Sequence, residues 1–131
     1  MAQRPSNCPA LISLLHRRHP SQHHWWLADG GYPQQFAALL EAPLQRTDRR
    51  AQGLEDWLDV FAPLLPLGAA DAHPTGHPAR YRYLLRLEAR GEQVCCWRRY
   101  PEGIGWQRRC QPMPLEQFVR RFSAGSRDAS S

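Results

Sequence analysis

The segment from Arg80 to Arg90 alternates between apolar and mostly polar side chains. Tyr81, Tyr83, Leu85, Leu87 and Ala89 fall on one side of the alternation, and Arg80, Arg82, Leu84, Arg86, Glu88 and Arg90 fall on the other. Successive side chains of a β-strand point to opposite faces of its sheet. The pattern therefore predicts a strand with one buried face and one basic face, and a sheet must form part of the fold.

Two more strands are predicted after this one, ending at Tyr100 and running from Ile104 to Cys110. A two-residue hairpin turn at Gly91-Glu92 is expected to join the first pair, in a register that places Arg86 opposite Trp97. The three strands form an antiparallel meander in this reading. Its basic face carries Arg82, Leu84, Arg86, Arg90, Cys95, Trp97, Arg99 and Arg109, and its apolar face carries Val94, Cys96, Tyr100, Ile104 and Trp106 beside the apolar residues of the first strand.

Four helices are expected outside the three strands. Apolar side chains at helical spacing, such as Leu54, Trp57, Leu58 and Phe61, predict amphipathic helices. An N-terminal helix is expected after a cap at Ser6 or Asn7, with Pro9 in its first turn. The predicted helices span 10–18, 33–41, 54–65 and 115–122.

These elements predict an α+β fold, with N-terminal helices, a three-stranded antiparallel β-meander and a C-terminal helix packed on one sheet face. A chain of 131 residues fits one domain. We expect a helical part at 7–65, a loop rich in Pro, Gly and His at 66–78, the meander with its helix at 79–122, and a frayed tail at 123–131. The chain has no apolar run of about 18 residues and no signal peptide, so we expect a cytoplasmic protein without a membrane span.

The positive charge of the chain is concentrated in its second half. All 17 basic residues are arginine, which is also what GC-rich coding would produce. Residues 1–78 hold six arginines against seven acidic residues, a net charge of −1, and residues 79–131 hold eleven against five, a net charge of +6. Such an asymmetry indicates an acidic partner.

The leading functional hypothesis is a small, non-enzymatic accessory or regulatory protein, such as an adaptor, chaperone or immunity-like protein. Trp and Arg dominate binding hot spots in protein interfaces, so the basic sheet face is expected to bind an acidic protein surface. One alternative is that the same face binds nucleic acid, with arginines on phosphates and the indole on a base. Another is that the face is only solvated. The predicted binding residues are Arg82, Arg86, Trp97, Arg99 and Arg109.

Histidine and cysteine residues provide weaker alternatives. His16, His19 and His23 are candidate ligands of a metal site, because His16 and His19 would share one face of a helix end. No catalytic motif is present and no cofactor is predicted, although a small enzyme remains a second alternative. None of the four cysteines forms a C-x-x-C pair. We expect them to be buried thiols, with a disulfide or a redox role as the alternative; the adjacent Cys95 and Cys96 must face opposite ways on a strand.

Overall fold

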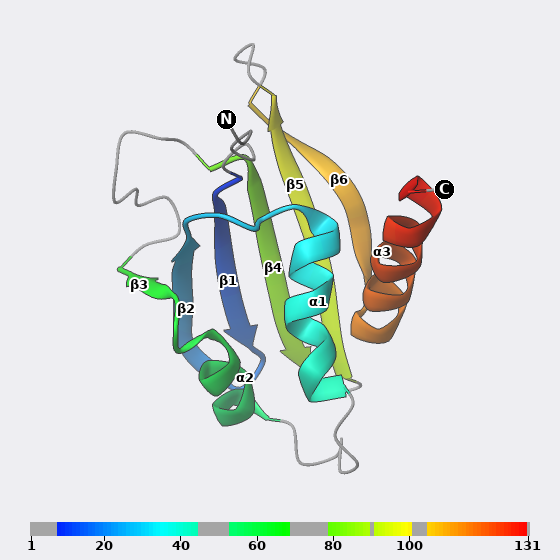
Figure 1. The fold of residues 1–131 in the computed structure, drawn as a ribbon. Coiled ribbons are helices and arrows are strands. Elements are labelled where there is room, and N and C mark those ends of the chain that lie inside the picture. Colours follow the sequence, from blue (N-terminus) through cyan, green and yellow to red (C-terminus); the bar gives the residue numbers. More distant parts are fainter. Residues whose placement is uncertain (1–7, 45–52, 69–78, 90, 101–104, 131) are drawn as a thin grey trace.

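The structure is a computed structural model that describes residues 8–44, 53–68, 79–89, 91–100 and 105–130. Six strands form one mixed sheet in the order β3-β2-β1-β4-β5-β6 (Figure 1). The strands are paired antiparallel except for β1 and β4, which are parallel. The elements in chain order are β1 (Ala10–His16), β2 (His19–Leu27), α1 (Pro33–Leu44), α2 (Leu54–Phe61), β3 (Leu65–Leu67), β4 (Tyr81–Glu88), β5 (Gly91–Tyr100), β6 (Gly105–Pro114) and α3 (Leu115–Ser130).

The expected arrangement of N-terminal helices beside a three-stranded sheet is wrong. The segment predicted as the first helix is strand β1, and it forms a hairpin with β2. Every residue from Ala10 to Leu14 is buried, because β1 lies inside the sheet between β2 and β4 and both of its faces are covered. Such a strand has a continuous apolar run in place of an alternating one. Leu11, Ile12, Leu14 and Leu15 therefore also matched the spacing of a helix.

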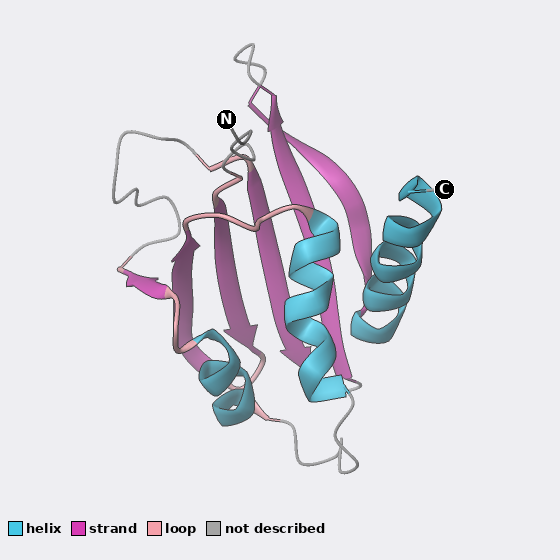
Figure 2. Cartoon of the chain, in the orientation of Figure 1, coloured by secondary structure: helices cyan, strands magenta, loops and turns pink. Residues whose placement is uncertain are grey.

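The three helices all lie on one face of the sheet (Figure 2). The main core fills the space between them and joins Ile12 of β1, Phe36 of α1, Trp57 of α2 and Phe118 of α3. The ring of Phe36 stacks on that of Tyr83 at a centroid distance of 4.0 Å. This aromatic contact fixes α1 over β4.

The predicted segments 33–41, 54–65 and 115–122 are helical, but their bounds differ from the prediction. Helix α1 continues through Pro43 to Leu44, and α2 ends at Phe61. The chain then forms the edge strand β3 at the start of the predicted loop 66–78, whose residues 69–78 lie outside the described part. Helix α3 runs to Ser130, where the sequence predicted a frayed tail at 123–131.

The register of the β4–β5 hairpin differs from the expected one by four residues. Trp97 lies opposite Arg82, not Arg86, and the strands meet at Glu88 and Gly91. Gly91 therefore belongs to β5, and the expected turn at Gly91-Glu92 is wrong. An even shift keeps every side chain of a strand on its face, so Arg82, Arg86, Cys95, Trp97 and Arg99 all point away from the helices; Arg90 lies outside the described residues.

Gly31 allows the chain to cross from β2 to α1 against the start of β1. Its amide donates a hydrogen bond to the Cys8 carbonyl at 2.8 Å, and its own carbonyl accepts one from the Tyr83 hydroxyl at 2.6 Å. A Cβ atom at Gly31 would lie 2.5 Å from the Cys8 carbonyl oxygen and 2.7 Å from Ala10 Cβ. Only a residue without a side chain fits this contact.

We predict that Gly31→Ala lowers the free energy of unfolding by about 1–3 kcal/mol, at the scale of an overpacked core, because backbone must move to admit the methyl group. Chemical denaturation of the purified variant measures this. Gly68→Ala is the matched control, since a Cβ there meets nothing within 4 Å. Equal stability of the two variants would contradict the close approach of Gly31 to β1.

Candidate functional site

The sheet face opposite the helices carries most of the described strand arginines. The β1–β4 and β4–β5 registers place Leu11, Arg82 and Trp97 in one row across it, and Ser13, Leu84 and Cys95 in the next. We call this surface the basic face. Its described residues include Leu11, Ser13, His24, Trp26, Arg82, Leu84, Arg86, Glu88, Cys95, Trp97, Arg99, Trp106 and Arg108.

Two arginine–tryptophan pairs connect β5 and β6 on the basic face. Trp97 lies opposite Arg108, and Arg99 lies opposite Trp106. The Arg108 guanidinium carbon is 5.6 Å from the Trp97 ring centroid, and that of Arg99 is 4.6 Å from the Trp106 centroid. Arg99 Nε also donates to the Ala79 carbonyl at 3.1 Å. A guanidinium on an indole gains cation–π attraction and still presents N–H groups at its edge.

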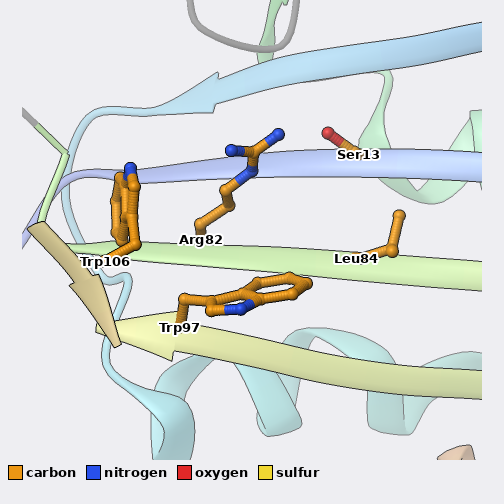
Figure 3. Close-up of a pocket in the computed structure, with 5 residues that line it drawn as sticks. All are labelled: Ser13, Arg82, Leu84, Trp97 and Trp106. Atoms are coloured by element: carbon orange, nitrogen blue, oxygen red, sulfur yellow. The ribbon is translucent and has the colours of Figure 1, made fainter. Parts of the chain in front are cut away.

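A pocket of about 310 Å³ opens beside these pairs and is lined by Ser13, Arg82, Leu84, Trp97 and Trp106. Figure 3 shows the Arg82 side chain extending from β4 across β1 towards Ser13, with the two indoles on the other sides. The side chain of Leu84 forms an apolar part of the pocket wall. The pocket thus combines a cation, a hydroxyl group and two aromatic surfaces, which are groups that bind an anion attached to an apolar body.

The charge of Arg82 is not balanced within the pocket. The side chain is half-buried, and the described residues provide it with no ion pair. Near Arg82, the Nδ1 atom of His24 forms a 2.7 Å hydrogen bond with Ser13 Oγ. Both residues are buried. Burial, with the nearby charges of Arg82 and His23, lowers the pKa of His24. The imidazole is therefore neutral at neutral pH, and the pocket holds one cation.

The described part of the basic face contains a single carboxylate. Glu88 lies 3.6 Å from Arg86 Nε, and both side chains are exposed. Exposed pairs of this kind contribute little to stability. The same face carries four arginines, Arg82, Arg86, Arg99 and Arg108, so its described residues have a net charge of +3.

The structure brings four of the five predicted binding residues to this face: Arg82, Arg86, Trp97 and Arg99. Arg109 is elsewhere, with its guanidinium 5.6 Å from the Phe122 ring on the helix side. Register irregularities on both sides of Cys96 shift the pairing of β6. Arg108 and Trp106 consequently take the basic face, although the alternation of the sequence placed Trp106 on the apolar one.

The sequence also missed Ser13 in the pocket and His24 as its hydrogen-bond partner, because their segments were not expected to be in the sheet. Their signal was present in the hairpin itself: Ser13 is the one hydroxyl in an apolar run, and β1–β2 pairing places it opposite His24. The Ser13 hydroxyl is committed to the imidazole and is 4% exposed.

The helical spacing behind the metal hypothesis is absent, because His16 ends β1 and His19 begins β2. His16 Nδ1 accepts a hydrogen bond from the Arg18 amide at 3.0 Å, and His23 stacks on Trp25. Nothing is described of the His19 side chain. Across the described ranges, no three His, Cys, Asp or Glu side chains are grouped as metal ligands.

No protein-family model matches the chain, and neither the curated proteins nor the solved structures include a significant match. Among the helices described, none has the length and apolar character needed to cross a membrane.

We predict that His24 makes the protein less stable in mild acid. Its pKa in the fold is below the usual value of 6.5, so the unfolded chain binds more protons than the fold between those two values. Stability therefore rises with pH in that window and is lost as the pH falls below about 6.5. Chemical denaturation of wild type and His24→Gln at pH about 7.5 and about 5.5 isolates this effect, since other groups cancel. We expect the stability of wild type minus that of His24→Gln to fall on acidification. An unchanged or larger difference at pH about 5.5 would contradict the prediction.

Proposed function

We propose that this chain is a small, non-enzymatic accessory or regulatory protein, of the adaptor, chaperone or immunity-like kind, that binds an acidic protein partner on its basic face. The cytoplasm is the proposed compartment, since all four cysteines are buried free thiols, which is the usual state in a reducing environment. The proposed contact residues are Arg82, Arg86, Trp97, Arg99, Trp106 and Arg108.

The observation that carries the proposal is Arg82 in its pocket. A half-buried cation is costly unless an anion accompanies it, and the described residues around Arg82 provide a neutral histidine, a hydroxyl and two indoles. A carboxylate of a partner would supply the missing charge. Trp97 and Trp106 would pack against the apolar part of the partner's residue, as aromatic anchors do in interfaces.

The arrangement of the indoles favours a protein over a nucleic acid. Sequence-independent binding of single strands depends on aromatic rings whose faces are available for bases. Here Arg108 and Arg99 lie over the rings of Trp97 and Trp106, so an arginine competes with a base at each ring. The stacked guanidinium groups still offer their edges, which match the two oxygens of a carboxylate. Nucleic-acid binding by the same face is the second candidate, because phosphates also pair with these arginines.

Selection from random libraries tests the proposal without knowledge of the partner. The purified chain is used to select from a displayed library of random peptides, and separately from a pool of random single-stranded oligonucleotides. We expect enriched peptides rich in Asp and Glu, whose binding weakens as salt is added. Enrichment of peptides without carboxylates would contradict the proposal. Tighter binding of the oligonucleotides than of any peptide would replace it with the nucleic-acid alternative.

We predict that Arg82→Ala weakens the binding of an enriched acidic peptide about tenfold or more, or about 1.4 kcal/mol, because the pocket loses its cation. Fluorescence anisotropy of the labelled peptide measures the affinity. Arg120→Ala is the matched control: it removes an exposed arginine from α3, on the helix side of the sheet. An equal loss of affinity in both variants would show that net charge, and not the pocket, governs binding.

A further inference from the structure

Cys96 of β5 and Cys110 of β6 form a close pair of thiols on the helix side of the sheet. The two residues are directly opposite each other in the β5–β6 register, and their Sγ atoms lie 3.5 Å apart and share a hydrogen bond. Both side chains are buried in the main core. The pair is independent of the basic face, since Cys95 and Trp97, its neighbours on β5, point to the opposite side.

The register of this pair is compatible with the backbone separation that a disulfide needs. Directly opposite residues of antiparallel strands have Cα atoms about 4.5–5.5 Å apart, and disulfides span Cα distances of about 4.4–6.8 Å. A disulfide bond is about 2.05 Å long, so the sulfur atoms need to approach by about 1.5 Å, which rotation of the two side chains provides.

The two thiols also differ in acidity, because the hydrogen bond with Cys110 and burial raise the pKa of Cys96. The hydrogen bond between the two thiols lowers the pKa of Cys110 to about 7 despite its burial, and Arg121 and Arg109 act in the same direction. Burial instead raises the pKa of Cys8 and of Cys95. The thiolate is the reactive form of cysteine. Cys110 lies on the edge strand and is 4% exposed, whereas Cys96 is fully buried. Cys110 is therefore the more reactive thiol of the pair.

We propose that Cys96 and Cys110 are a redox-active dithiol site, which a hydroperoxide converts into an intramolecular disulfide between β5 and β6. Oxidation is thus confined to this pair, and the other two cysteines, Cys8 and Cys95, stay as thiols.

The reaction proceeds in two balanced steps. The Cys110 thiolate attacks the outer oxygen of the hydroperoxide, the O–O bond breaks, and a proton and the leaving alkoxide or hydroxide form an alcohol or water. Cys110 is then a sulfenic acid. The Cys96 sulfur attacks the Cys110 sulfur, the S–O bond breaks, and hydroxide leaves with the Cys96 proton as water. Two electrons pass from the dithiol to the peroxide, and a low-molecular-weight thiol reverses the reaction by exchange.

The test is a thiol count and a peptide map after treatment of the folded protein with a small excess of hydrogen peroxide. Excess peroxide is removed, free thiols are blocked under denaturing conditions, and the protein is digested without reduction. We expect the four thiols of the reduced chain to fall to two, and a cross-linked peptide pair to contain Cys96 and Cys110. Trypsin separates the two cysteines because Arg98, Arg99, Arg108 and Arg109 lie between them.

Cys95→Ala is the matched variant, because Cys95 is adjacent on the same strand and faces the other way. It should keep the cross-link, and its peptide then contains Cys96 alone, which makes the assignment unambiguous. Cys110→Ser should retain all three of its thiols under the same treatment. Should Cys110→Ser fail to fold, the map of Cys95→Ala still decides the question.

Four results would overturn the proposal: all four thiols persist in wild type, the cross-link joins any other pair, the product is a disulfide-linked dimer, or Cys110 accumulates as a sulfinic acid with Cys96 still free. Loss of the cross-link in Cys95→Ala would also overturn it. None of these results depends on what the basic face binds.

Discussion

The fold depends on the burial of β1 at the centre of the sheet. This strand pairs antiparallel with β2 along one edge and parallel with β4 along the other, and it joins the N-terminal hairpin to the β4–β6 strands. Ile12 and Leu14 pack under the helices, and Leu11 and Ser13 are buried on the basic face. A parallel pair requires a crossover connection, and here the connection includes α1 and α2. One sheet and one main core follow from this placement.

Because the three described helices all cover one face, no described helix packs on the basic face. A small second cluster of Leu11, Trp26 and Ala79, with Leu67 and Trp106 against it, covers the sheet there. Beyond it, arginine stems and indoles alternate across β4, β5 and β6. Arginine suits this position because its stem packs on apolar surface while its guanidinium stays available. The same arrangement that covers the sheet leaves a cation, Arg82, at the mouth of a pocket.

The pattern of the sequence was informative where one strand face is polar and misleading where both are buried. Alternation from Tyr81 to Glu88 identified β4 and its two faces. The face of each β4 and β5 side chain was predicted correctly despite the wrong register, because the register differs by an even number of residues. β1 shows no alternation, so its apolar run was read as a helix, and the Ser13–His24 contact could not be foreseen. Register irregularities at Cys96 moved Trp106 and Arg109 to the faces opposite to those expected. Such irregularities depend on pairing partners and have no local sequence signal here.

The central claim is that an acidic partner is bound at the pocket of Arg82, Trp97 and Trp106. Its most direct test is an NMR titration of the folded chain with a glutamate-rich peptide that follows the indole N–H signals. The account predicts that the signals of Trp97 and Trp106 shift, whereas those of Trp25 and Trp57, which pack in the main core beneath the helices, stay in place. Shifts confined to Trp25 and Trp57, with Trp97 and Trp106 unmoved, would contradict it.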